Sequence, residues 1–383
     1  MTTTIDVRIH VEETEYQAPT LWRMLGATSK SGHIRTLCER NQIRPRRLLE
    51  VGAGDGAILR CLGEAGFCDQ MHAVEISASG VAVILEQDIP GLVSCQTFNG
   101  YQLPFEDGYF DLVILSHVLE HVEFERVLLR EIRRVSRHQV IEIPLDFTAL
   151  RNEAFHLIGP SYGHINAHSP DSLRFMLSQE RLRVLDEILG HYSLDLQEYD
   201  HFVNNGHERT PGAEAAFRAR FRESQSEFAA LPRASQESRA SIYAVLTREE
   251  RSDELRARAI AAVKSSIASG QVQAARLIFE HYLREPHSAA AALDVADHFA
   301  DAKPVVALQY LDRVRALDPG NVRVAQCDAR ITDAIRKARE TPPPPVAPAT
   351  AAAVAAAPAG ARERLKHRLS GLVPLVRRLR RWL

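Results

Sequence analysis

The fold is decided by the stretch Leu48-Leu-Glu50-Val-Gly52-Ala-Gly54-Asp-Gly56, which reads as a strand followed by a glycine-rich turn. Because glycine has no side chain, the backbone of such a turn can adopt unusual dihedrals and approach a ligand closely. With Ala57 the stretch also satisfies the looser dinucleotide pattern G-x-G-x-x-G/A. The turn alone therefore predicts a nucleotide-type cofactor, and a nicotinamide or flavin enzyme stays among the alternatives.

Strand-like and helix-like segments alternate around this turn. Alternation of this kind is typical of βα units that form a mostly parallel sheet. The predicted strands are 47–52, 71–76, 92–97, 111–116 and 138–143, with a returning strand at 240–247. The predicted helices between them include 57–63 and 123–135. The sequence thus indicates an α/β domain that ends near residue 248.

Two carboxylates narrow the choice of cofactor. Glu50 stands inside the first strand, where a dinucleotide fold normally has an apolar residue. A buried carboxylate is costly without a partner, so a cationic group of the ligand is expected beside it. Glu75 ends the second strand and suits the two hydroxyls of a ribose, from which a carboxylate accepts hydrogen bonds.

Four segments together resemble the class I S-adenosylmethionine-dependent methyltransferases, and most of all their type-11 group. They are Glu50-Val-Gly52-Ala-Gly54-Asp-Gly56, Val74-Glu75, Leu103-Pro104-Phe105 with the following residues to Val113, and Ser116-His117-Val-Leu119-Glu120-His121-Val122. The resemblance covers about residues 46–248. It implies a Rossmann-like seven-stranded methyltransferase fold and S-adenosyl-L-methionine as the cofactor, and it disfavours a nicotinamide oxidoreductase.

The resemblance also implies which residues hold the cofactor. Glu75 would grip the ribose, Asn99 would contact the adenine, and Leu115 and Ser116 would lie under the methionine part. Family members usually carry Asp at the position of Asn99, and an amide oxygen can still accept from the adenine amino group. The full expected set is Glu50, Gly52, Ala53, Gly54, Gly56, Glu75, Ile76, Asn99, Gly100, Leu115 and Ser116.

Methyl transfer from a sulfonium needs mainly alignment of nucleophile, methyl group and sulfur. A hydroxyl acceptor gains from a general base, for which histidine is the commonest choice. His164 is the preferred candidate, followed by His117 and His121, and each of them could instead be a packing or loop histidine. No metal is expected, since the spacing of His156, His164 and His168 is unsuited to a ligand set.

Five regions are predicted along the 383 residues. An N-terminal helical segment or lid (1–45) precedes the methyltransferase domain (46–248). A helical region (253–338) follows, in which 307–319 resembles the second helix of a tetratricopeptide repeat and a plain helical bundle is the alternative. A Pro/Ala-rich linker (341–360) leads to a basic amphipathic helix (361–383). The fold class is therefore α/β with a C-terminal all-α, degenerate TPR-like region.

Composition limits the location and the partners. Five cysteines without a close pair and the lack of an apolar leader predict a cytoplasmic protein. A net charge of −2 gives no reason to expect nucleic acid. The basic segment 361–383 suits an anionic membrane surface, such as the inner face of the cell membrane, or an acidic protein partner, and the helical repeats suit a protein partner.

The predicted activity is O-methylation of a small molecule or glycan intermediate. The acceptor site is expected from the insertions 1–30 and 145–235, which contain no motif that fixes a substrate. The alternative is a non-catalytic interaction protein that retains an S-adenosylmethionine-binding-like domain and uses its helical repeats and basic tail.

Overall fold

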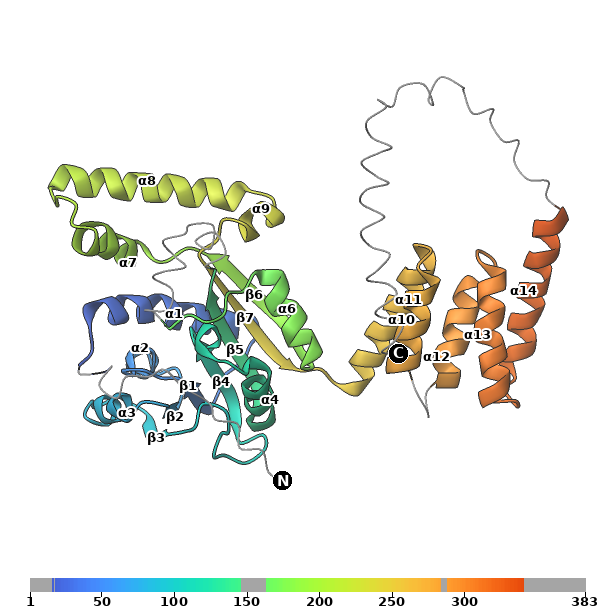
Figure 1. Cartoon of the computed structure of the whole chain (residues 1–383), viewed down its shortest axis with the longest axis horizontal. Helices are drawn as coiled ribbons and strands as arrows, with labels where there is room; N and C mark the ends of the chain where they lie inside the picture. Colours follow the sequence, from blue (N-terminus) through green and yellow to red (C-terminus); the bar gives the residue numbers. More distant parts are fainter. Residues whose placement is uncertain (1–15, 17, 146–162, 284–287, 341–383) are drawn as a thin grey trace, which may run out of the picture. The chain divides into compact units, whose positions relative to one another are not determined.

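The computed structural model describes residues 16, 18–145, 163–283 and 288–340. The chain forms two compact units, Met1–Glu254 and Leu255–Leu383, each of which has its own helices (Figure 1). The predicted linker at 341–360 and the predicted basic helix at 361–383 lie outside the described residues.

A seven-stranded sheet forms the centre of the first unit, in the order β3-β2-β1-β4-β5-β7-β6. Its strands are β1 (Arg47–Val51), β2 (Gln70–Glu75), β3 (Leu92–Thr97), β4 (Phe110–Ser116), β5 (Ser136–Pro144), β6 (Leu182–Gly190) and β7 (Ile242–Glu249). Strands β1 to β5 pair in parallel, whereas β7 is antiparallel to both of its neighbours. The strand order reverses between β1 and β4, so a ligand crevice is expected at the carboxyl ends of these strands.

Strand β6 is the one element of the sheet that the sequence did not predict. It lies inside the segment 145–235, which was assigned to an acceptor insertion. Asp186 and Glu187 stand in the middle of its apolar residues, and the register with β7 shifts between Val184 and Asp186. This irregularity breaks the alternation of apolar and polar residues by which strands are recognised. The other six strands lie within two residues of their predicted bounds.

Helices flank the sheet on both faces. They are α1 (Leu21–Arg40), α2 (Ala57–Glu64), α3 (Ala78–Leu85), α4 (Glu125–Val135), α6 (Pro170–Gln179), α7 (Leu194–Tyr199), α8 (Pro211–Ala230) and α9 (Arg233–Glu237), with short turns at Leu119–His121 and Asp200–Asn204. Ser169 caps α6 and forms a capping box with Ser172, while Pro170 occupies the first turn.

The alternation of side chains along the strands builds two cores. On one face, Leu49, Val113 and Ile141 pack with residues of α4 and α6. On the other face, Leu48 and Ile114 pack with residues of α1 and α2. Because successive residues of a strand point to opposite faces, the position of a residue in its strand decides which helix it meets.

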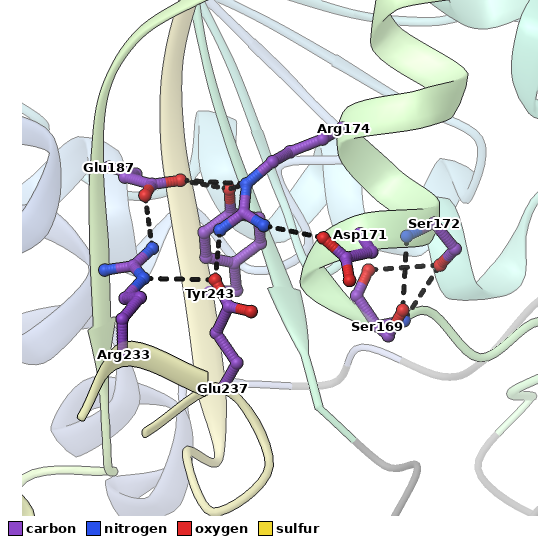
Figure 2. A network of polar contacts seen from close by, with 8 residues as sticks. All are labelled: Ser169, Asp171, Ser172, Arg174, Glu187, Arg233, Glu237 and Tyr243. Atoms are coloured by element: carbon purple, nitrogen blue, oxygen red, sulfur yellow. Dashed lines mark hydrogen bonds and ion pairs between the residues drawn. The ribbon is translucent and has the colours of Figure 1, made fainter. Parts of the chain in front are cut away.

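A polar network fastens α6 and α9 to the sheet edge (Figure 2). Arg174 of α6 donates to the Tyr243 hydroxyl of β7 over 2.8 Å and lies 3.2 Å from Glu187 of β6. Glu237 of α9 pairs with both Arg174 and Arg233, and Arg233 also reaches Glu187. Glu187, one of the two charged residues that interrupt the strand pattern of β6, is thus paired with two arginines in the folded chain.

The second unit is wholly helical. Its helices are α10 (Ser252–Ala268), which begins at the boundary, α11 (Val272–Tyr282), α12 (Ser288–Phe299), α13 (Pro304–Leu317) and α14 (Arg323–Glu340). Val295, Ala296 and Phe299 of α12 are buried in a core shared with α13. A helical region is therefore present, and its likeness to tetratricopeptide repeats stays a prediction. Within the described residues, no helix combines the length and apolar character needed to cross a membrane.

Candidate active site

Three polar residues gather at the carboxyl ends of β1, β4 and β5. Glu50 lies opposite Ile114, and Ser116 lies opposite Glu142. All three share the face of the sheet that α1 covers, because they alternate with residues packed on the other face. From α1, the imidazole Nδ1 of His33 lies 2.8 Å from Glu142 Oε2. Helix α1 therefore covers the carboxyl ends of these strands. It lies in the segment 1–45, which was predicted to be an N-terminal helical segment or lid.

The turn after β1 requires glycine at positions 52 and 54. Gly52 and Gly54 have φ values of +71° and +60°, which L side chains rarely adopt. A Cβ atom on Gly52 would come 2.7 Å from Cγ2 of Val118. The ring of Tyr16 packs against Gly54, where an added Cβ would lie 3.3 Å from it. The turn is thus in close contact with the segment after β4 and with the N-terminal segment.

A cavity of about 280 Å³ lies over the turn. Residues of α1, of the glycine turn, of the end of β4 and of the segment after β6 line it. They are Tyr16, Trp22, Arg23, Gly26, Ala27, Lys30, Glu50, Gly52, Ala53, Gly54, Asp55, Ala57, Ile58, Ser116, His117, Tyr192 and Leu196. Of the eleven expected cofactor residues, five line this cavity: Glu50, Gly52, Ala53, Gly54 and Ser116.

Glu50 provides a buried carboxyl group inside the cavity. It is 2% exposed, and its Oε2 atom makes no hydrogen bond within the described part of the chain. Burial raises the pKa of Glu50 to about 8, with Lys30 opposing the rise and Asp55 and Glu75 adding to it. A buried carboxyl with an unused oxygen fits a ligand that brings its own positive charge. The ammonium group of S-adenosylmethionine is such a charge.

Glu75 is held rigidly beside the turn. Its Oε2 accepts from the Gly54 amide over 2.9 Å, and its Oε1 accepts from the amides of Ile76 and Ser77 over 2.9 and 3.0 Å. Each carboxylate oxygen has two lone pairs, so these contacts orient the group and leave capacity for the hydroxyls of a ribose. The three amides fix the geometry before a ligand arrives.

Asn99 closes a local turn next to Gly100. Its Oδ1 accepts from the amides of Tyr101 and Gln102 over 3.0 and 2.7 Å. Its expected contact with adenine stays a prediction. Leu115 is fully buried in the core, so it contacts a ligand only through its backbone, if at all.

His117 is the one candidate base that lines the cavity. Its Nε2 lies 3.3 Å from Glu142 Oε1, and its Nδ1 lies 3.6 Å from Glu120 Oε1. Its φ of +55° is rare for a residue with a side chain, and such conformations cluster at functional sites. Burial and the Lys30 charge lower the pKa of His117 to about 4, against the opposing effect of Glu142. The imidazole is thus neutral at physiological pH.

His164 and His121 lie together outside this cavity lining. Their rings meet edge to face with centroids 4.8 Å apart, and His121 Nδ1 lies 3.0 Å from the Gly163 carbonyl oxygen. Possible ligand atoms of Glu120, His121 and His164 fall within 4.8 Å of one another, the size of group that a metal ion can occupy. This trio shares only His164 with the set His156, His164 and His168, for which the sequence predicts no metal. His156 lies outside the described residues, and His168 pairs with Glu125 of α4.

Lys30, His33 and Glu142 are site residues that sequence reasoning missed. Glu142 could have been found, because it stands at the end of the fifth predicted strand just as Glu50 and Glu75 stand in theirs. For Glu142, the contacts with His117 and His33 outweigh burial and hold the pKa of this carboxyl below its usual range. Lys30 and His33 carried no signal, since only the packing of α1 brings them to the strand ends.

Comparison with known proteins agrees with this geometry. A family model described as a methyltransferase domain matches residues 49–141. Ajmaline N-methyltransferase from Rauvolfia serpentina is 33% identical over 98 residues, which cover 24% of this chain and 33% of that protein. The ubiquinone/menaquinone biosynthesis C-methyltransferase UbiE from Vibrio vulnificus is 29% identical over 182 residues, which cover 42% of this chain and 68% of that protein.

Among solved structures, geranyl diphosphate C-methyltransferase from Streptomyces coelicolor A3(2) is similar with a TM-score of 0.37 and 15% identity. The match covers 53% of this chain and 72% of the other.

A doubly wound sheet with an antiparallel last hairpin, a glycine turn after β1 and acids at the ends of β1 and β2 define a nucleoside-cofactor domain of the methyltransferase type. With the match of residues 49–141 to the methyltransferase-domain family, the findings support a class I S-adenosylmethionine-dependent methyltransferase. The cofactor of this family is S-adenosyl-L-methionine, and Glu50, Glu75 and the glycine turn fit it. The shared region spans a third of the ajmaline enzyme and about two thirds of UbiE.

Proposed function

We propose that this protein transfers the methyl group of S-adenosylmethionine to a hydroxyl oxygen of a small molecule or glycan intermediate. A hydroxyl must lose its proton during the transfer, whereas an amine can attack as the free base. The observation that supports an oxygen acceptor is the position of His117 between two carboxylates at the cavity wall. Burial disfavours the protonated imidazole, and Glu142 offsets part of this cost when His117 takes up a proton. On this basis His117 is proposed as the general base.

In this proposal His117 replaces His164 as the preferred base. The chain's own residues bind the cofactor, align its methyl group and sulfur with the acceptor oxygen, and remove the hydroxyl proton. Alignment supplies most of the rate enhancement in a displacement of this type. The bound cofactor supplies the methyl group on a sulfonium, whose departure as a neutral thioether makes the transfer favourable. Glu142 keeps His117 oriented through its second contact with His33 of α1.

The test compares His117→Asn with the matched variants His164→Asn and His168→Asn. Asparagine tolerates the left-handed conformation of residue 117 and cannot take up a proton at neutral pH. Transfer from S-adenosylmethionine with an isotope-labelled methyl group is followed into a fractionated extract of small molecules and glycans. The expected result is a loss of about 10²- to 10⁴-fold for His117→Asn. Affinity for S-adenosylhomocysteine, measured by calorimetry, should stay within about threefold.

Three outcomes would contradict the proposal. Full turnover of His117→Asn together with a large loss in His164→Asn would return the role to His164. A transferred label whose chemical shift is that of an N- or C-methyl group would exclude the hydroxyl acceptor. Calorimetry that detects no binding of either cofactor form would favour the non-catalytic interaction protein.

A further inference from the structure

We propose that Lys30 binds the carboxylate of the cofactor's methionine end, so that Lys30 and Glu50 together recognise both charges of an α-amino acid group. This inference rests on the proposed cofactor chemistry and extends it to a residue of α1. It concerns which charges the cavity requires in its ligand, and it is independent of the identity of the acceptor and of the catalytic base.

The packing of α1 places Lys30 in the cavity. Ala27 and Ile34 are buried against the sheet and fix the inner face of the helix. Lys30 and His33 lie three residues apart, which puts them one turn from each other on the same side. The contact of His33 with Glu142 holds this side over the ends of β4 and β5. Lys30 lines the same cavity as Glu50 and Ser116.

Lys30 lacks a close anionic partner in spite of the acidic surroundings. Glu142, Glu120, Glu50 and Asp55 all act on it by charge, yet in the described part of the chain none of them forms an ion pair with it within 4.0 Å. Burial outweighs these attractions and lowers the pKa of Lys30. A half-buried ammonium that is surrounded by acids but contacts none of them is stabilised by a carboxylate that arrives with a ligand.

The charges of the cofactor match this arrangement. Its methionine end carries an ammonium and a carboxylate on one carbon atom, and the sulfonium adds a second positive charge. Glu50 has the unused oxygen for the ammonium. Lys30 is the largest single charge acting on Glu50, which indicates that the two side chains are neighbours. Two opposite charges side by side recognise the two groups of an α-amino acid in one orientation, and this orientation fixes where the methyl group points.

The experiment measures binding of S-adenosylmethionine and of decarboxylated S-adenosylmethionine to the full-length protein by calorimetry. Both ligands carry the sulfonium and an amino group, so their comparison isolates the carboxylate. The variants are Lys30→Met and Lys30→Arg, with Arg35→Met as the matched control. Arg35 is an exposed cation on the same helix. Thermal denaturation of each variant checks that the fold is retained.

Loss of a charge-assisted contact weakens binding by roughly 10- to 100-fold. We therefore expect Lys30→Met to lose that much affinity for S-adenosylmethionine and less than about threefold for the decarboxylated form. Lys30→Arg should retain most of the affinity, and Arg35→Met should bind both ligands as the unsubstituted protein does. A change in the ionisation of Glu50 would affect both ligands, so it cancels in the ratio.

Equal losses for both ligands in Lys30→Met would overturn the inference, because Lys30 would then act only through the structure of the cavity. A loss selective for S-adenosylmethionine in Arg23→Met, with Lys30→Met unchanged, would assign the carboxylate to Arg23, which also lines the cavity. Absence of binding to the unsubstituted protein would instead refute the proposed function, and the role of Lys30 with it. These results are distinguishable within one set of titrations.

Discussion

Individual side chains at the strand ends control the charge of the site. Glu50 is a buried acid, Lys30 is a half-buried base, and His117 is a neutral imidazole between two carboxylates. The cavity therefore exchanges protons when a charged ligand enters. Glu50 gives the clearest consequence, because its pKa is raised to about 8 by burial.

Cofactor binding should release a proton from Glu50. In the free protein this carboxyl is mostly protonated below pH 8, whereas the ligand's ammonium favours the ionised form. Affinity should rise with pH, by up to roughly tenfold per unit between about pH 6 and about pH 7.5. Above that range the cofactor's amino group, with an ordinary pKa of ~7.8, begins to lose its charge. Calorimetry in two buffers of different protonation enthalpy measures the proton. The same release from Glu50→Gln would refute this assignment.

At the level of elements, the edge of the sheet depends on the polar network that joins α6, β6, β7 and α9 (Figure 2). Tyr243 is fully buried there, and burial raises the pKa of its hydroxyl, as does the contact with Glu187. None of the residues of this network lines the cavity.

Arg174→Leu should destabilise the protein, because it leaves Glu187 and the Tyr243 hydroxyl without their shared donor. Arg174 is partly exposed, so we expect a loss of about 2 kcal/mol in the free energy of unfolding. Chemical denaturation measures this change. Arg222→Leu on α8 removes an exposed arginine and serves as the control, with an expected change below about 0.5 kcal/mol. If the two variants lost the same stability, the network would have no special role.

At the level of the whole molecule, the two units have separate cores. The sheet cores contain residues of Met1–Glu254, and the core of α10 to α14 contains residues of the second unit. Every described residue that lines the cofactor cavity belongs to the first unit. The second unit is therefore free to serve another purpose, such as the predicted contact with a protein partner.

A protein truncated after residue 254 should bind S-adenosylhomocysteine with an affinity within about twofold of the full chain, since it retains the complete cavity. Calorimetry on the two proteins measures this, and circular dichroism checks the fold of the shorter one. A well-folded truncated protein that binds more than tenfold more weakly would show that the helical unit contributes to the cofactor site.

The sequence determined the cofactor class and most of the sheet. Gly52 and Gly54 can be recognised in the sequence because their backbone conformation excludes other residues. Glu50 can be recognised because an acid in a buried strand requires a partner. Strand β6 was not predicted because Asp186 and Glu187 interrupt its alternation of apolar and polar residues. The charges of these two residues are balanced only by residues distant in the chain.

Only the tertiary structure decided which histidine faces the cavity and which cation accompanies Glu50. The sequence favoured His164 over His117 and His121, whereas in the folded chain His117 lines the cavity and His121 packs against His164 outside that lining. Lys30 lies on a helix whose inner face is defined by the sheet it covers. Local periodicity specifies strands and turns, whereas the meeting of α1 with three strand ends depends on the packing of the whole core.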